Sequence, residues 1–366
     1  MRIIIFILII ISLLAPNALM PFKAPVSAPP VTGILNPKST AIQPLKTAGI
    51  QRAQFKRIVG AWAPYWDQEN VMKSFKQNTK LMNEVSPYWY FTKADGKLAP
   101  VPAKFDLRLI AEARKNGIKV IPMTSNDFDG AMISRILNDP RLRKNHINAI
   151  VDTVVKHDFD GIDLDYEGLL AKDRKMYAYF VHVLADKLHR KGKVLSVTLQ
   201  AKVKEPGHTN ATKAQDWREL GKYADRLRIM AYDYHWKTSP PGPIAPKFWV
   251  EQVAKFARST IPARKAILAL GTYGYNWNGG GRARPITIAQ ARQLARAKKQ
   301  PIRRDPKSSE LFLKLGPGAP RIWLQDSGSL KAKLEVVKKY NLGGVVFWRL
   351  GDEDAANWQV VKSELS

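Results

Sequence analysis

Short apolar runs recur from residue 57 to the end of the chain, and stretches with helical spacing of apolar residues separate them. Runs of this kind, bounded by Gly or Pro, are typical of buried parallel strands that alternate with amphipathic helices. Eight strand–helix repeats predict an α/β fold, a (β/α)8 TIM barrel. The predicted strands are Arg57–Tyr65, Glu84–Phe91, Lys119–Met123, Phe159–Asp165, Val194–Leu199, Arg226–Ala231, Lys265–Thr272 and Gly343–Trp348.

Helices are predicted between these strands, and one connection is too long to hold a single helix. About fifty residues, 279–328, follow the seventh strand and contain a basic helix near Ile288–Lys299 and two strand-like runs. We expect them to form a small α+β insertion on the C-terminal face of the barrel. The predicted barrel helices include Asp106–Asn116, Asn145–His157, Lys172–Lys191 and Leu330–Tyr340.

The N-terminal part of the chain has a different composition. Arg2 is followed by the run Ile3–Leu14, which is apolar apart from Ser12. This matches a secretory signal and is shorter than the roughly 20 residues that a spanning helix needs. Residues 1–20 are therefore predicted to be a signal peptide or an uncleaved N-terminal membrane anchor, and 21–56 a Pro-rich basic tether. In both cases we expect the barrel, 57–366, to lie outside the cytoplasm, secreted or anchored.

Charge and composition restrict the partners of the protein. The 366 residues include 59 Lys and Arg, 31 Asp and Glu and no Cys, which excludes disulfides and cysteine-based chemistry. Seven basic residues and no acid lie in the first 60 positions, and eight basic residues and no acid lie in Arg282–Arg304. An anionic cell-wall polymer or a membrane surface fits this pattern. No nucleic-acid-binding motif is present, so nucleic acid is not expected. The alternative is that the charge serves solubility alone.

Carboxylates alternate with apolar residues in the fourth predicted strand. Asp163, Asp165 and Glu167 share one face of this strand, which in a barrel points into the lumen and towards the C-terminal mouth. Acids so close together share protons, and at least one pKa rises, which keeps a proton donor available near neutral pH. Glu167, nearest the mouth, is the predicted donor. An acid cluster paired with Arg or Lys, or a divalent-cation site, are the alternatives.

The run from Asp160 to Glu167 matches DxxDxDxE and resembles the signature of the family 18 glycoside hydrolases, the chitinases and their relatives. Met230-Ala231-Tyr232-Asp233 resembles the MxYD of that family, and Trp348 stands where the family keeps a tryptophan under the reacting sugar. The resemblance covers about residues 57–360. The runs Glu84–Tyr90 and Gly344–Gly351 resemble bacterial cell-wall and spore-cortex-lytic members, whereas the run Met123-Thr124-Ser125-Asn126 departs from the SxGG of chitinases.

The resemblance implies hydrolysis of β-1,4 bonds next to N-acetylglucosamine by a retaining mechanism in which the acetamido group of the substrate is the nucleophile. Glu167 would protonate the leaving oxygen, Asp165 would hold the acetamido N–H, Asp163 would share a proton with Asp165, and Tyr232 would orient the acetamido group. We expect no cofactor, no metal and a monomer. The remaining candidates are Asp160 at the strand base, Asp233 and Trp348 at the sugar (a core role is the alternative for Trp348), and the aromatic residues Trp62, Tyr90 and Tyr273.

The expected partner is a polysaccharide that contains N-acetylglucosamine, and peptidoglycan is the leading interpretation. Hydrolysis of chitin or chitooligosaccharides is the alternative within the enzyme class. A non-catalytic, lectin-like sugar-binding protein is the alternative from another class. The usual sign of that reuse is loss of the acid, and Glu167 is present.

Overall fold

A computed structural model of the chain describes residues 56–103, 105–279 and 282–365. The predicted signal or anchor at 1–20, and the tether up to residue 55, lie outside the described residues. Within the described part of the chain, no helix is long and apolar enough to cross a membrane.

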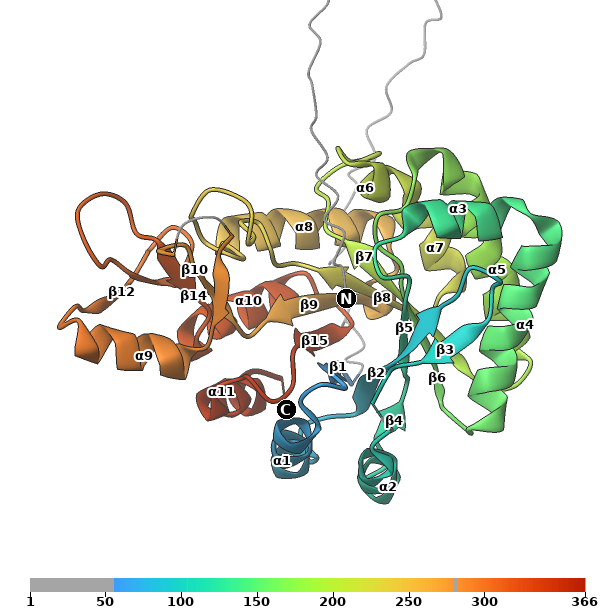
Figure 1. Cartoon of the computed structure of the whole chain (residues 1–366), viewed down its shortest axis with the longest axis horizontal. Coiled ribbons are helices and arrows are strands. Elements are labelled where there is room, and N and C mark those ends of the chain that lie inside the picture. Colours follow the sequence, from blue (N-terminus) through green and yellow to red (C-terminus); the bar gives the residue numbers. More distant parts are fainter. Residues whose placement is uncertain (1–55, 104, 280–281, 366) are drawn as a thin grey trace, which may run out of the picture. The chain divides into compact units, whose positions relative to one another are not determined.

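Eight parallel strands close into a barrel (Figure 1), as the sequence predicts. Neighbouring strands pair in the order β1, β2, β5, β6, β7, β8, β9 and β15, and β15 pairs with β1 to close the ring. The barrel strands are β1 (Ile58–Ala63), β2 (Glu84–Thr92), β5 (Met123–Ser125), β6 (Gly161–Asp165), β7 (Val194–Gln200), β8 (Arg226–Met230), β9 (Ala266–Gly271) and β15 (Gly344–Trp348).

The third predicted strand is divided in two. β4 (Lys119–Val120) and β5 both pair with β2, and the register along β2 shifts between Tyr88 and Tyr90. Pro122 lies between β4 and β5, where proline has no N–H to give to a neighbouring strand. The short strand β3 (Leu98–Pro100), which the sequence analysis did not predict, pairs antiparallel with β2.

Helices surround the barrel and bury the outward-facing apolar residues of its strands in one continuous core. The second predicted helix begins five residues earlier than expected, at Pro140, because Asp139 caps it by accepting hydrogen bonds from the backbone N–H groups of Arg141 and Leu142. The helices of the barrel are α1 (Gln68–Asn78), α2 (Leu107–Lys115), α3 (Gly130–Asn138), α4 (Pro140–Lys156), α5 (Arg174–His189), α6 (Asn210–Ala214), α7 (Trp217–Tyr223), α8 (Lys247–Thr260), α10 (Ser327–Lys339) and α11 (Ala355–Leu365).

The lumen is divided into an apolar and a polar side. An apolar cluster of Trp62, Met123, Ile267, Ala269 and Val346 fills one part of it. The other part is polar, because alternate residues of β2, β6, β7 and β8 carry charged or hydroxyl groups. These buried groups are Glu84, Ser86, Asp163, Ser196, Thr198 and Arg228.

A small domain interrupts the barrel after β9. It begins at Gly274, earlier than the predicted boundary at 279, and it contains a five-stranded antiparallel sheet where the sequence predicted two strands. The helix α9 (Ile288–Ala297) covers this sheet, and the two share an apolar core of their own (Figure 1). The strands are β10 (Gly274–Asn276), β11 (Arg284–Ile286), β12 (Ile302–Arg304), β13 (Leu311–Leu313) and β14 (Ile322–Leu324).

Candidate active site

Glu167 follows β6 directly and is held through its backbone. The side chain of Asn126 accepts a hydrogen bond from the Glu167 N–H and donates one to the Glu167 carbonyl, both at 2.8 Å. Asn126 comes just after β5, in the run that departs from the chitinase pattern, and it is buried. The two hydrogen bonds fix the backbone from which the predicted proton donor extends. The sequence analysis missed Asn126 in this role.

Burial raises the pKa of the Glu167 carboxyl to about 7. The negative charge of Asp233 also raises this pKa. The Gln200 amide lowers it, because its Nε2 lies 3.5 Å from Glu167 Oε2. A carboxyl with this pKa is substantially protonated near neutral pH. It is therefore able to serve as a general acid and then as a general base.

The pKa of the Asp165 carboxyl is strongly raised. Burial raises its pKa well above the ordinary value, and the nearby charges of Glu167 and Asp163 raise it further. Its Oδ1 is buried and makes no hydrogen bond among the described residues. Asp165 thus lies next to Glu167, close to the mouth, with a carboxyl whose pKa is well above its ordinary value.

Asp163 lies deeper in the lumen and is fully buried. Its Oδ2 accepts hydrogen bonds from Trp62 Nε1 at 2.8 Å, from an Arg228 guanidinium nitrogen at 3.0 Å and from Thr198 Oγ1 at 3.2 Å. Asp163 therefore has the ion pair with Arg that was one alternative for this cluster, while Asp165 and Glu167 have no salt bridge within the described part of the chain.

Tyr232 and Asp233 leave the end of β8 on the same side as these acids. Burial raises the pKa of the Tyr232 hydroxyl, and the charges of Asp165 and Glu167 raise it further. Asp233 has a positive φ of 57°, and its carboxylate accepts hydrogen bonds from the hydroxyls of Tyr273 and Tyr275. Asp233 and Tyr273 thus form one hydrogen-bonded group beside Tyr232.

Aromatic residues form one wall of the mouth. Trp348, half-buried at the end of β15, lies with its ring centre 6.0 Å from that of Trp62 and 6.4 Å from that of Trp66. Trp66 is 52% exposed and also packs against Tyr88. Trp62 itself is buried below this layer, where it reaches Asp163 and does not reach the surface.

Two predicted site residues lie away from the mouth. Tyr90 is only 4% exposed and packs against Phe105 and Phe159 in the outer core, so its assignment as a sugar contact is corrected. In a regular strand Tyr88 and Tyr90 would share one face. The register shift between them turns Tyr90 to the outer face, while Tyr88 stays on the lumen side. Asp160 lies below the start of β6, where its carboxylate accepts a hydrogen bond from the Val120 N–H and joins β4 to β6.

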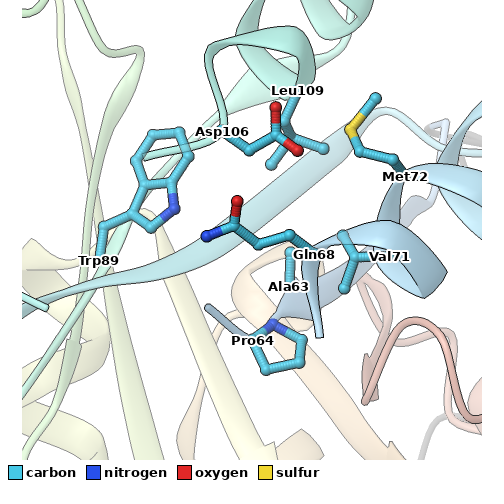
Figure 2. A pocket seen from close by; sticks show the side chains of 8 residues that line it. All are labelled: Ala63, Pro64, Gln68, Val71, Met72, Trp89, Asp106 and Leu109. Atoms are coloured by element: carbon cyan, nitrogen blue, oxygen red, sulfur yellow. The ribbon is translucent and has the colours of Figure 1, made fainter. Parts of the chain in front are cut away.

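A small pocket between the end of β1 and the helices α1 and α2 is shown in Figure 2, and none of the site carboxyls lines it. Among the residues that the structure describes, no group of three or more His, Asp or Glu side chains is placed to hold a metal ion. The lining residues of this pocket are Ala63, Pro64, Gln68, Val71, Met72, Trp89, Asp106 and Leu109.

Barrel enzymes keep their active sites at the C-terminal mouth, and a pair of neighbouring carboxyls there is typical of glycoside hydrolases. The chain matches the family model "Glycosyl hydrolases family 18" over residues 44–354 and belongs to this family. It is therefore a glycosidase, and the fold, the family and the enzyme class predicted from the sequence are confirmed.

Known proteins support this assignment. The chain is 25% identical over 308 residues to the cortical fragment-lytic enzyme of Bacillus subtilis strain 168, covering 81% of this chain and 71% of that protein. The spore cortex-lytic enzyme SleL of Bacillus megaterium has the same fold, with a TM-score of 0.78 at 24% identity over 85% of this chain and 74% of that one. A chitinase from Chromobacterium violaceum has a TM-score of 0.77 at 25% identity, covering 85% of this chain and 99% of that chain.

Proposed function

We propose that this glycosidase cleaves β-1,4 bonds next to N-acetylglucosamine in peptidoglycan, by a retaining mechanism in which the substrate acetamido oxygen is the nucleophile. The observation that carries the proposal is the pair formed by Glu167 and Asp165. One carboxyl has a pKa of about 7 at the mouth, and the pKa of its neighbour is raised well above the ordinary value by burial and by the nearby charges of Glu167 and Asp163. The similarity to cortex-lytic enzymes supports a cell-wall glycan as the substrate.

In the proposed first step, protonated Glu167 donates its proton to the glycosidic oxygen as the bond to the anomeric carbon breaks. The acetamido oxygen attacks the anomeric carbon from the other face and forms an oxazolinium ion. Tyr232 donates a hydrogen bond to the acetamido group, which holds the oxygen in line for this attack. Asp165 accepts a hydrogen bond from the acetamido N–H through its carbonyl oxygen.

In the second step, the Glu167 carboxylate removes a proton from water as the water attacks the anomeric carbon. The oxazolinium ring opens, the acetamido group is restored, and Glu167 is protonated again, so the configuration is retained. The aromatic wall around Trp348 and Trp66 would stack against the sugar faces. Trp348 packs against Trp62, and Trp62 contacts Asp163, which supports binding of the reacting sugar on this side of the mouth.

The experiment compares products, by mass spectrometry, from purified peptidoglycan, from chitin hexamer and from a fully deacetylated glucosamine hexamer. We expect cleavage of peptidoglycan next to N-acetylglucosamine and no cleavage of the deacetylated chain. Preferential cleavage of chitin hexamer would establish the chitinase alternative. Cleavage of the deacetylated chain at a comparable rate would contradict substrate assistance.

The matched control is Glu167→Gln, which keeps the shape of the side chain but cannot deliver a proton. We expect at least a 10²-fold loss of kcat with glycan binding preserved. Turnover near that of the wild type would overturn the assignment of Glu167. Binding without turnover in the wild type would establish the lectin-like alternative.

We also propose that the small domain carries a binding surface for an anionic wall polymer. All eight basic residues of Arg282–Arg304 are exposed. Arg292 pairs with Asp354 and Arg304 with Asp326, while the other six have no carboxylate partner within the described residues. Phosphate or carboxylate groups of a polymer would supply those partners. These six residues are Arg282, Arg284, Arg296, Lys298, Lys299 and Arg303.

A further inference from the structure

A buried guanidinium group lies directly below the catalytic acids. Arg228 extends from β8 into the lumen and is 1% exposed. It donates hydrogen bonds to Asp163 Oδ2 at 3.0 Å, to Glu84 Oε2 at 3.3 Å and to the Ser86 hydroxyl. Its guanidinium carbon is 5.6 Å from the centre of the Trp62 ring. Because a guanidinium is not deprotonated in proteins, Arg228 is a permanent positive charge in the lumen.

The buried charges around Arg228 form a balanced set. Arg226 Nε lies 2.9 Å from Glu84 Oε1, and Arg228 bridges Glu84 and Asp163. Two cations therefore face two carboxylates. Asp165 lies outside this set, since it has no salt bridge among the described residues and its Oδ1 is buried without a hydrogen bond. A charge on Asp165 would be the one buried charge here without compensation, which is costly.

The hydrogen bonds to Asp163, like the charges around it, favour a carboxylate at this position. Asp163 Oδ2 accepts from the Trp62 indole and the Arg228 guanidinium, two groups that can only donate. Donors of this kind stabilise the charged form of a carboxyl. A proton on Asp163 Oδ2 would displace one of these donors, and Asp163 Oδ1 already receives the Thr198 hydroxyl at 3.4 Å, whereas Asp165 Oδ1 receives no donor among the described residues.

We propose that Arg228 is a positioning residue that sets the charges of the active site: its ion pair keeps Asp163 a carboxylate, so the proton of the Asp163–Asp165 pair stays on Asp165. The inference rests on the proposed function for its consequence in catalysis. It differs from the sharing of a proton between the two acids that the family resemblance implied. Asp165 then meets the acetamido group as a neutral acid throughout binding.

The other titratable groups that face this set are few among the described residues. β2 contributes Tyr88 besides Glu84, the end of β8 contributes Tyr232, and α5 brings the Tyr177 hydroxyl within the field of both acids. Burial raises the pKa of all three hydroxyls, so they stay neutral through the pH range of the enzyme. β1, β7, β9 and β15 present no charged side chain to the lumen, so Arg228 is the cation that acts on Asp163.

The first test replaces Arg228 by methionine, which has a long side chain but no charge, and by lysine, which keeps the charge. The readout is the pH profile of kcat/KM on a neutral chitooligosaccharide. Loss of the positive charge raises the proton affinity of the acids, so in Arg228→Met the profile moves to higher pH, by about one unit. Arg228→Lys restores the position of the wild-type profile even where kcat is lower. Variants that lose activity at every pH without any displacement would show a purely structural role and overturn the proposal.

The second test needs no turnover and no Arg228 variant. Infrared spectra of the enzyme labelled with carbon-13 aspartate report whether a buried Asp carboxyl is protonated. At neutral pH we expect one protonated buried carboxyl band in the wild type, absent from Asp165→Asn. A band that persists in Asp165→Asn and is lost in Asp163→Asn would place the proton on Asp163 and overturn the proposal. Because the substrate is absent, a failure here is distinct from a failure of the proposed reaction.

Discussion

At the scale of single residues, the chemistry depends on how far each carboxyl is removed from water and which groups surround it. The three acids of one strand face have three different environments: Asp163 receives a guanidinium and two other donors, Asp165 receives none on Oδ1, and Glu167 lies at the opening. Burial and neighbouring charges raise the pKa of the Asp165 carboxyl well above its ordinary value, and burial raises that of Glu167 to about 7.

The pKa of the Glu167 carboxyl predicts how activity and stability depend on pH. Its folded-state pKa, about 7, lies above the ordinary 4.5, so the acid form needed for the first step is lost as pH rises through 7. By linkage, its contribution to stability is fully present below about 4.5 and is lost as pH rises through about 7. We therefore expect kcat/KM to decline above pH 7, and Glu167→Gln to raise Tm more at pH 8 than at pH 5. A Tm difference that is equal at both pH values would contradict the raised pKa.

Asn126 provides a second prediction at this scale. Removing its amide in Asn126→Ala breaks both hydrogen bonds to the Glu167 backbone, so the donor loses its fixed position. We expect kcat to fall by about 10- to 100-fold, with little change in the Kd for glycan. Isothermal titration on the background of Glu167→Gln gives the Kd, and steady-state kinetics give kcat. An unchanged kcat would show that the backbone of Glu167 is held without Asn126.

At the scale of elements, strand β6 depends on a close approach to its neighbour β7. β6 begins at Gly161, and a Cβ added there would lie 2.1 Å from the Val194 carbonyl oxygen of β7. A glycine at this position lets the two backbones approach closely, which fixes the height of Asp163 and Asp165 in the barrel.

Gly161→Ala should therefore be strongly destabilising, because the clash is with backbone that belongs to a paired strand. We expect a loss of about 3 kcal/mol or more in the free energy of unfolding by urea, or failure to fold. The matched control is Gly316→Ala, where no atom lies within 4 Å of the added Cβ. A stable, active Gly161→Ala enzyme would contradict the strand spacing described here.

At the scale of the whole molecule, the proposed attachment to a wall polymer uses basic residues other than those of the candidate active site. The candidate active site contributes little to the net charge of +28, because the cations Arg226 and Arg228 form ion pairs with Glu84 and Asp163. Six exposed cations of the small domain, on α9 and the segments beside it, have no carboxylate partner among the residues that the structure describes. Their field is long-ranged and therefore sensitive to salt.

Binding to intact cell walls should weaken steeply as salt rises, because exposed charges are screened beyond about 10 Å at 0.1 M salt. Turnover of a short neutral oligosaccharide should change little over the same range. Replacing Arg282, Arg284, Arg296 and Arg303 by Gln should reproduce the high-salt behaviour at low salt. Wall binding is measured by co-sedimentation.

The control removes the same charge from exposed positions of α2 and α4, two helices that lie away from α9 in Figure 1. This variant should bind walls nearly as well as the wild type. Equal loss in both variants would mean that total charge matters and that the small domain has no special surface. The control replaces Lys115, Arg141, Lys144 and Lys156 by Gln.

Local sequence periodicity was sufficient to predict the eight barrel strands, because a buried parallel strand needs a continuous apolar run whatever its neighbours are. It also placed Asp163, Asp165 and Glu167 on one face, since alternation along a strand is a local property. The strand divided at Pro122 and the misplaced Tyr90 show where periodicity fails. A register shift moves side chains to the other face without any change in composition.

Tertiary structure determines which groups surround the acids of the site. Asp163 and Arg228 are 65 positions apart, and Asn126 and Glu167 are 41 apart, so neither pairing has a local signal in the sequence. Closure of the barrel brings β8 across the lumen from β2 and next to the acids of β6, and only then does an arginine inside a strand become the partner of a catalytic carboxylate. The candidate acids can thus be recognised in the sequence, whereas the groups that surround them are supplied only by the closed barrel, because electrostatic energy depends on distance in space and not along the sequence.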